Sequence, residues 1–173
     1  MGFLKKLLVL GVVLVGGLWL YGRSLPREHR VASTITLVAS PDSVYRTIRD
    51  IAGASRWWGD AISVRRLSRS RESYVQDMGA AGSVSIEVIA EDPPNRFVTR
   101  ILNDDQQDFG GTWAYTVRRS ESGTEVRITE DGWVATPFFR VIAKLRGQRR
   151  TMNSYLTSLG AHFGETVTPR DGK

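Results

Sequence analysis

The sequence predicts a membrane-anchored α+β protein, in which one apolar helix precedes a single domain built from an antiparallel sheet and a long C-terminal helix. Two observations support this prediction. Residues 7–20 form an uninterrupted apolar run, and the later residues follow the order strand, two helices, six strands and one long helix. Such a sheet buries one face, and an apolar-striped helix is suited to cover it. Of the 173 residues, 41% are hydrophobic and 24% charged, as in packed globular chains.

The apolar run reads LLVLGVVLVGGLWL and contains no charged side chain. With its flanks it provides about 20 residues, which at about 1.5 Å each can cross a hydrocarbon core. Trp19 and Tyr21 fall where interfacial aromatic residues occur. We therefore expect residues 1–22 to form a single-pass anchor. A cleaved signal peptide is the main alternative, and the bulky residues that end the run disfavour it because peptidase sites require small side chains. A buried helix of a soluble protein is a third alternative, disfavoured because the run is apolar on all sides.

The flanking charges leave the orientation of the anchor open. Lys5 and Lys6 favour a cytoplasmic N-terminus, whereas Arg23, Arg27 and Arg30 favour the opposite arrangement.

The first elements of the domain follow a short linker. Pro26 breaks the apolar helix, so residues 23–29 are expected as a linker, 30–164 as the domain and 165–173 as a flexible tail. Alternating residues over 31–38 predict a strand with one buried side. Ser40-Pro41-Asp42 is a helix-start signal, followed by apolar residues at helical spacing. A second, short helix is expected at residues 54–58.

Six further strands are separated by turn residues such as Pro93-Pro94, Gly110-Gly111 and Ser122-Gly123. Their short connections predict an antiparallel meander. Beyond Pro137 the apolar residues return to helical spacing as far as Phe163, which predicts one long helix. The six strands are expected at residues 62–69, 73–78, 83–90, 96–103, 112–120 and 124–134.

Composition excludes several kinds of site. The chain has no cysteine, so disulfides, thiolate metal sites and a cysteine nucleophile are excluded. His29 and His162 lie at opposite ends of the sequence, and the acidic cluster of Asp104, Asp105 and Asp108 lacks the spacing of a calcium loop. We expect no metal and no cofactor. The net charge of +6 accompanies no nucleic-acid motif, so no nucleic acid is expected as a partner, and the sequence carries no signal for an oligomeric state.

Four short motifs resemble the SRPBCC superfamily. They are the Ser-Pro-x-x-Val-Tyr helix start at residues 40–45, the Trp57-Trp58 pair, Gly-Thr-Trp-x-Tyr at 111–115 and the strand at 124–130. This START-like group includes the polyketide cyclase/dehydrase and lipid-transport proteins. The resemblance implies a helix-grip fold, in which a seven-stranded curved sheet wraps around a long helix and encloses a hydrophobic cavity. It also implies the binding of apolar molecules, with catalysis in a minority of members.

Alternate residues of a strand share one face of the sheet, and this pattern identifies candidates that line the cavity. Glu130 shares a strand face with Val126 and Ile128, so a carboxylate lies in line with apolar residues. It is a candidate acid or base, or an anchor for a ligand head group, and the alternative is a solvated strand-end carboxylate. Trp113 and Tyr115 share a face of the preceding strand, where ligand contact and core packing explain them equally well. Glu130 and Tyr115 are the two candidate catalytic residues.

The remaining candidates are expected near the entrance or the helix. Arg100 is a candidate for an anionic head group, although an outward solvated arginine is favoured. Each of the others has core packing as its alternative. Together, the expected cavity residues are Trp57, Trp58, Arg100, Trp113, Tyr115, Glu130, Phe138, Phe139 and Met152.

The sequence thus favours a membrane-bound domain that holds a hydrophobic small molecule or lipid. The alternatives are a cyclase/dehydrase-like enzyme and an interaction module whose cavity is filled by its own side chains. Residues 140–150 also contain five cations and no acidic residue, which indicates either a solvated helix face or a surface for anionic lipid.

Overall fold

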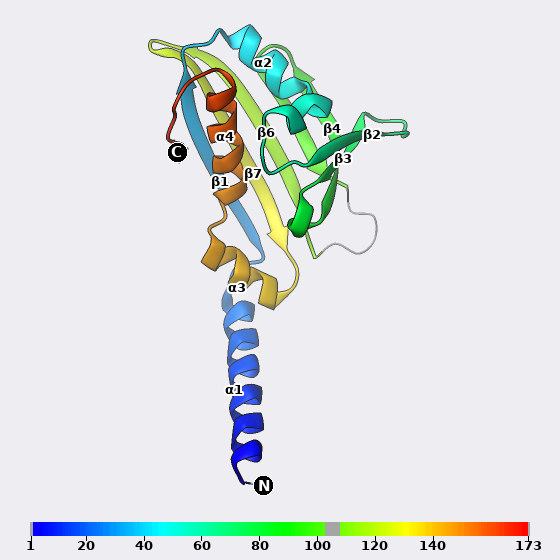
Figure 1. Ribbon diagram of the computed structural model, residues 1–173, viewed down its shortest axis with the longest axis vertical. Coiled ribbons are helices and arrows are strands. Elements are labelled where there is room, and N and C mark those ends of the chain that lie inside the picture. The colour runs from blue at the N-terminus through cyan, green and yellow to red at the C-terminus, as the bar shows by residue number, and fades with distance from the viewer. Residues whose placement is uncertain (1, 103–107, 173) are drawn as a thin grey trace.

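The computed structural model of the protein describes residues 2–102 and 108–172, which form an apolar helix joined to an α+β domain (Figure 1). The sheet is antiparallel, with the strand order β2-β3-β4-β5-β6-β7-β1-β8. The strands are β1 (Glu28–Leu37), β2 (Ser63–Leu67), β3 (Ser73–Asp77), β4 (Ser83–Asp92), β5 (Arg96–Ile101), β6 (Phe109–Ser120), β7 (Gly123–Val134) and β8 (Arg170–Asp171). The helices are α1 (Gly2–Ser24), α2 (Pro41–Arg49), α3 (Pro137–Arg146) and α4 (Arg150–His162), with 3-10 turns η1 (Ile51–Arg56) and η2 (Gly79–Ala81).

The predicted α+β architecture is confirmed, and the seven expected strands are all present. Asn103, the expected end of one strand, lies outside the described residues, as do Asp104 and Asp105. The predicted second helix is the 3-10 turn η1, which begins at Ile51. An eighth strand, β8, comes from the segment that we expected to be a flexible tail. Its two residues pair with Ser33 and Thr34 of β1, and Glu165 accepts hydrogen bonds from the backbone of Val38.

The long C-terminal helix was predicted wrongly as one element. Gly147 has φ +82°, in the left-handed region that favours glycine, and it ends α3 three residues before α4 begins. The two helices meet different surroundings. Met152, Leu156 and Leu159 of α4 are fully buried against the sheet, whereas Leu145 of α3 is 81% exposed.

Helix α4 covers the concave face of the sheet and completes the core (Figure 1). Tyr155 packs edge-on against both Trp57 and Trp58, with ring centroids 4.9 and 5.0 Å away. Phe97 and Tyr115 stack in parallel at 4.3 Å. These aromatic rings fill the middle of the domain. Ser40 caps the start of α2 by accepting a hydrogen bond from the Ser43 amide at 3.3 Å.

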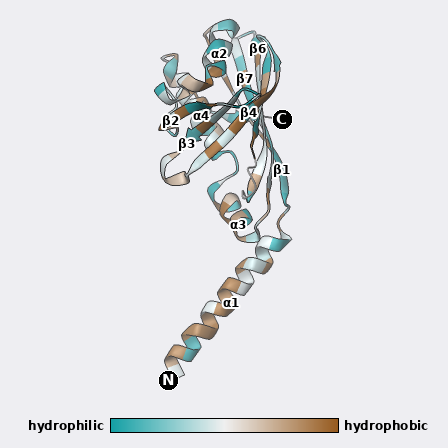
Figure 2. Ribbon diagram, turned by 90° about the vertical axis from the view of Figure 1, so that its right-hand side faces the viewer, coloured by the Kyte–Doolittle hydropathy of each residue, from teal (hydrophilic) through white to brown (hydrophobic). Residues whose placement is uncertain are grey.

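Helix α1 projects from the end of the domain opposite to α2 (Figure 2). Among the described residues it is the one helix that is long and apolar enough to cross a membrane, and the large apolar side chains from Phe3 to Tyr21 are all at least 39% exposed. Length and composition of this kind also occur in signal sequences. Its last turn is different, because Gly22 is buried and an added Cβ there would lie 2.2 Å from the carbonyl oxygen of Pro137. The junction of α1 with the domain is therefore packed against α3, and only Leu25 to Arg27 separate α1 from β1.

Candidate functional site

A cleft of about 790 Å³ is lined by residues of the sheet and of the α3–α4 connection. The α3–α4 connection lies at the end of the domain near α1 (Figure 1). Its sheet-side wall is mainly apolar, and its helix-side wall is mainly polar and cationic. The sheet side and its turns contribute Ile62, Met78, Ile101, Phe109, Trp133 and Val134 together with His29 and Glu130, and the helix side contributes Ala143, Arg146, Gln148, Arg150 and Thr151. The cleft therefore suits a molecule with both an apolar and a polar part.

Two carboxylates line the described part of the cleft, Asp60 in the turn before β2 and Glu130 in β7, and neighbouring strands position Glu130. Trp113 of β6 lies directly opposite Glu130 in the sheet and donates its indole N–H to Oε2 at 2.7 Å. On the other side, Nε2 of His29 in β1 lies 2.9 Å from Oε1. The side chains of His29 and Glu130 are 13% and 21% exposed, so both groups remain reachable from the cleft.

Gly132 makes room for this pair. It lies opposite His29 in the register of β1 and β7, and a Cβ atom there would lie 2.7 Å from the imidazole ring and 3.1 Å from Oε1 of Glu130. The imidazole of His29 occupies the space that a side chain at position 132 would otherwise fill. The hydrogen-bonded carboxylate, imidazole and indole thus form a polar cluster that can hold a hydroxyl or carbonyl group, or exchange a proton with it.

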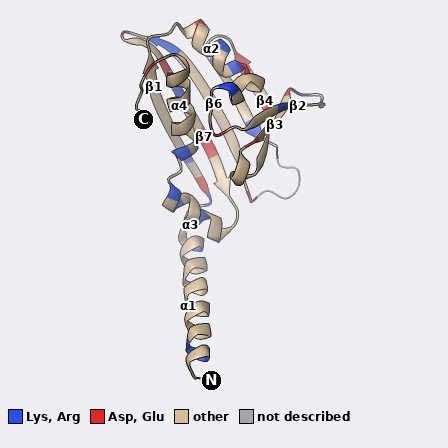
Figure 3. Ribbon diagram, viewed as in Figure 1, with Lys and Arg blue, Asp and Glu red and all other residues tan. Residues whose placement is uncertain are grey.

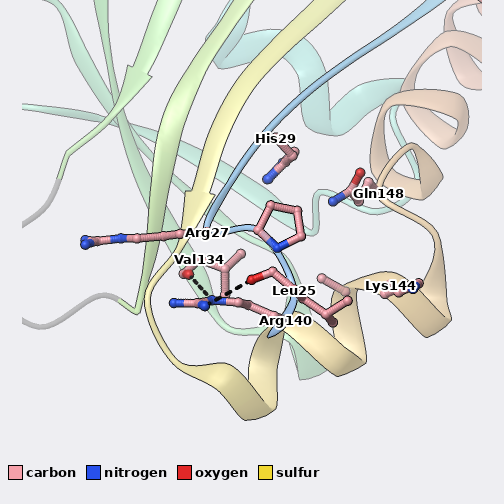
Figure 4. A pocket seen from close by; sticks show the side chains of 9 residues that line it. Leu25, Arg27, His29, Val134, Arg140, Lys144 and Gln148 are labelled. Carbon is pink, nitrogen blue, oxygen red and sulfur yellow. Dashed lines mark hydrogen bonds between the residues drawn. The ribbon is translucent and has the colours of Figure 1, made fainter. Parts of the chain in front are cut away.

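A second, smaller cavity of about 330 Å³ adjoins the cleft and shares His29, Val134, Ala143 and Gln148 with it (Figure 4). Arg140 fixes its floor by donating hydrogen bonds to the carbonyl oxygens of Val134 at 2.9 Å and Leu25 at 3.2 Å. His29 therefore lies between the two cavities and contacts both.

The structure separates the sequence-predicted site residues into four groups, of which the fourth is Arg100 alone. Glu130 lines the cleft and Trp113 contacts it through the hydrogen bond to Glu130. The second group belongs to the core, where Trp58, Tyr115 and Met152 are buried and Trp57 is partly buried against them. Phe138 and Phe139 form the third group and lie exposed on α3, outside the residues that line the cleft.

Arg100 lies away from the cleft. In β5 it alternates with Thr99 and Ile101, and it pairs with Glu87 of β4, whereas Ile101 lines the cleft. Because successive strand residues point to opposite faces, the Arg100 side chain lies on the other side of the sheet. It therefore corresponds to the outward arginine that the sequence favoured.

Tyr115 was grouped with Glu130 as a candidate catalytic residue, yet its hydroxyl is enclosed. The side chain is 7% exposed and does not line the cleft. Burial raises the pKa of Tyr115 well above its ordinary value, a hydrogen bond with Thr99 opposes this rise, and the charge of Glu130 adds to it. Burial likewise raises the pKa of Tyr155. Both tyrosines therefore stay neutral and act mainly in packing.

Sequence reasoning missed His29, Met78, Phe109 and the α3–α4 connection as parts of the site. The distance of His29 from Glu130 in sequence hides their contact, which arises only because β1 pairs with β7. Alternation in β1 offered a signal, since His29 falls on the same face as Ile35 and Leu37. No group of three or more His, Asp and Glu side chains is arranged to hold a metal among residues 2–102 and 108–172.

Comparison with known proteins supports the architecture. The profile of a family described as polyketide cyclase/dehydrase and lipid transport matches residues 28–163. A search of the curated proteins found no match. Solved structures resemble this chain at low sequence identity. That likeness supports the fold and does not transfer their functions to this chain.

Three of these structures illustrate the likeness. The Zhui aromatase/cyclase from Streptomyces sp. R1128 is 16% identical, with 78% of this chain and 93% of that chain covered and a TM-score of 0.66. A START superfamily protein from Mycobacterium smegmatis is also 16% identical over 78% of this chain and 96% of its own, with a TM-score of 0.63. The protein TTHA0849 from Thermus thermophilus is 20% identical, with 78% of this chain and 94% of that chain covered and a TM-score of 0.59.

Proposed function

Because this chain belongs to the polyketide cyclase/dehydrase and lipid transport family, we propose that it binds a hydrophobic small molecule or lipid in the cleft while α1 anchors it in a membrane. The observation that carries this proposal is the cleft of about 790 Å³ beside Glu130, with an apolar sheet-side wall. Burial of an apolar ligand there contributes about 25 cal/mol per Å² before the entropic costs of binding.

The polar cluster supplies orientation in this proposal. Glu130 already accepts hydrogen bonds on both oxygens, one from Trp113 and one shared with His29. A ligand hydroxyl that reaches the pair finds a carboxylate or imidazole partner at the edge of an apolar wall. One polar contact of this kind adds about 1 kcal/mol and selects ligands that carry a matching group.

The anchor places the cleft near lipid. Helix α1 ends at Ser24 and packs on α3, and α3 contributes Ala143 and Arg146 to the cleft. Since only a few residues join α1 to β1, a membrane that holds α1 keeps the cleft within a short distance of the lipid surface. The local concentration of a lipid-soluble ligand is then high.

Native mass spectrometry of the detergent-purified full chain tests the binding proposal. We expect a co-purifying apolar molecule, and we expect Glu130→Gln to weaken its affinity about fivefold and so lower the bound fraction. Phe138→Ala, which lies outside the cleft, is the matched control and should retain the ligand. A chain that remains empty across lipid mixtures would refute binding.

The His29–Glu130 pair also favours a second candidate function, an enzyme of the cyclase/dehydrase kind. An imidazole hydrogen-bonded to a carboxylate can take a proton from one ligand atom and return it to another, as elimination of water requires. Incubation of the purified chain with its extracted ligand, followed by mass analysis, would show the loss of water. This loss should disappear in His29→Gln, whereas ligand that is recovered unchanged from the unmodified chain would contradict catalysis.

A further inference from the structure

Helix α3 exposes an apolar stripe that nothing in the described part of the chain covers. Phe138 is 51% exposed, Phe139 46% and Leu145 81%. Phe138, Ile142 and Leu145 follow one another at helical i, i+4, i+7 spacing and therefore lie along one face. An exposed apolar face of this length marks a surface that contacts something other than water.

The exposure of this stripe is imposed by the other face of α3. Arg140 donates hydrogen bonds to Val134, Ala135 and Leu25 carbonyl oxygens at 2.9, 2.7 and 3.2 Å. Val141 beside it is 5% exposed and packs into the domain. With one side of α3 fixed to the domain, the helix cannot rotate to bury its apolar stripe.

Helix α3 also lies at the level of the aromatic end of α1. Nζ of Lys144 is 2.9 Å from the Tyr21 hydroxyl oxygen and 5.4 Å from the centre of its ring. Two residues further, the Arg23 guanidinium lies 5.0 Å from the Trp19 ring. Trp and Tyr residues that flank an apolar span sit at the membrane–water boundary, so α3 is held at that boundary when α1 spans.

The basic residues around α3 indicate what kind of surface contacts this helix. The segment from Trp133 to Arg150 holds five cations and no acidic residue, and the cations gather around α3 and its connection to α4 (Figure 3). Arg140 is bonded to backbone carbonyl oxygens and Arg149 pairs with Asp171 at 2.9 Å, which leaves Lys144, Arg146 and Arg150 to contact a surface. A protein partner with an apolar patch would match the stripe alone. An anionic bilayer matches the stripe and its cations together, with chains for the apolar side chains and phosphates for the basic ones.

We propose that α3 lies in the interface of a bilayer that contains anionic phospholipid. Phe138 and Leu145 insert between the upper acyl chains, and Lys144 and Arg146 contact headgroup phosphates. Each cation near such a surface strengthens the contact about fivefold. This proposal rests on the spanning of α1 that the proposed function includes, and it extends that function. Because α3 also lines the cleft, one wall of the cleft lies at headgroup level.

Site-specific fluorescence quenching tests the proposal in the full chain, which has no native cysteine. Single variants Leu145→Cys, Leu14→Cys and Val38→Cys carry a fluorophore, and the lipids carry a nitroxide quencher on their acyl chains. Leu14 reports the span, and Val38, which is 82% exposed between β1 and α2, is the solvent control. Vesicles consist of phosphatidylcholine with or without phosphatidylglycerol. Phe138→Cys repeats the measurement on the same stripe.

We expect quenching at Leu145 and Phe138 to approach that at Leu14 and to increase with phosphatidylglycerol, while Val38 stays at the solvent baseline. Quenching at Leu14 with baseline values at both α3 positions would overturn the docking of α3 and leave the anchor intact. Baseline values at all positions would overturn the anchor and the docking together. The role of anionic lipid would be refuted if quenching at Leu145 were the same with and without phosphatidylglycerol. It would also be refuted if adding Arg146→Gln to the Leu145→Cys variant did not decrease the quenching.

Discussion

The two ends of this domain differ in what occupies the space between the sheet and its helices. Near α2, the aromatic rings of Trp57, Trp58 and Tyr155 fill that space, and Leu156 and Leu159 are fully buried. Near α1, the same sheet opens into a cleft, and the helix that adjoins it leaves Leu145 81% exposed. The α2 end is therefore packed as a core, whereas the α1 end is open, which is the end where we propose that ligand and lipid bind.

The largest expected effect is a difference in stability between variants of two leucines, one in α4 and one in α3. Leu156→Ala in α4 should lower the free energy of unfolding by about 2–5 kcal/mol, because it leaves a cavity in the core. Leu145→Ala in α3 should change it by less than about 0.5 kcal/mol. Denaturant unfolding of both variants in one detergent measures the difference, and equal losses would mean that the two ends are packed alike.

The junction between α1 and α3 gives the next largest effect. Gly22→Ala should destabilise the junction by about 1–3 kcal/mol, because the new Cβ meets the carbonyl oxygen of Pro137 at 2.2 Å. The Val134 amide donates a hydrogen bond to the carbonyl oxygen of Arg27, which lies next to the junction. Hydrogen exchange at this amide should become faster. Gly16→Ala is the matched control, since nothing lies within 4 Å of its added Cβ. Unchanged exchange in Gly22→Ala would contradict a packed junction.

Two tryptophans provide a smaller and more selective comparison. Trp113 donates to Glu130, whereas the Nε1 atom of Trp58 is buried without a hydrogen-bond partner among the described residues. A double-mutant cycle of Trp113→Phe with Glu130→Gln should give a coupling energy of about 1–2 kcal/mol. The cycle of Trp58→Phe with Glu130→Gln should give none. Similar coupling in both cycles would show that the polar cluster is not local to the cleft.

The smallest expected effect concerns pH at the α2 end. Arg49 pairs with Glu72 at 2.7 Å and with Glu91 at 2.9 Å, and its hydrogen bond lowers the pKa of Glu72 to about 2. A lowered carboxyl pKa stabilises the fold above the ordinary value of 4.5, and this stability is lost as the pH falls toward about 2. Arg49→Gln should cost about 1 kcal/mol at neutral pH and flatten this acid dependence in unfolding curves. Arg56→Gln, at an exposed pair with Asp50, is the control and should leave the slope intact.

The sequence allowed most of the fold to be predicted, because helix-start residues and strand alternation are local signals. Ser40-Pro41 begins α2 as expected, and parity on β7 placed Glu130 in line with Val126 and Ile128. The break at Gly147 was missed because Leu145 and Met152 are seven residues apart and remain in phase across it. Periodicity reports the phase of a stripe and not whether the helix continues.

The site was less predictable because its parts come together only in the sheet. His29 and Glu130 are 101 residues apart, and the pairing of β1 with β7 brings them within hydrogen-bonding distance. Phe138 and Phe139 were expected at the lip of the cavity because they begin the predicted long helix beside Pro137. The break turns them outward on α3 instead.

Photo-crosslinking in membranes tests the central claim most directly, namely that a lipid-soluble ligand occupies the cleft at the α1 end. The full chain is reconstituted with a diazirine-bearing fatty acid, illuminated and digested, and the labelled peptides are identified. We expect labels on peptides that contain Met78 and Phe109, which both line the cleft, and we expect an untagged fatty acid to compete them away. Labels confined to α1 and α3 would contradict the claim, because they would show contact with lipid and no occupancy of the cleft.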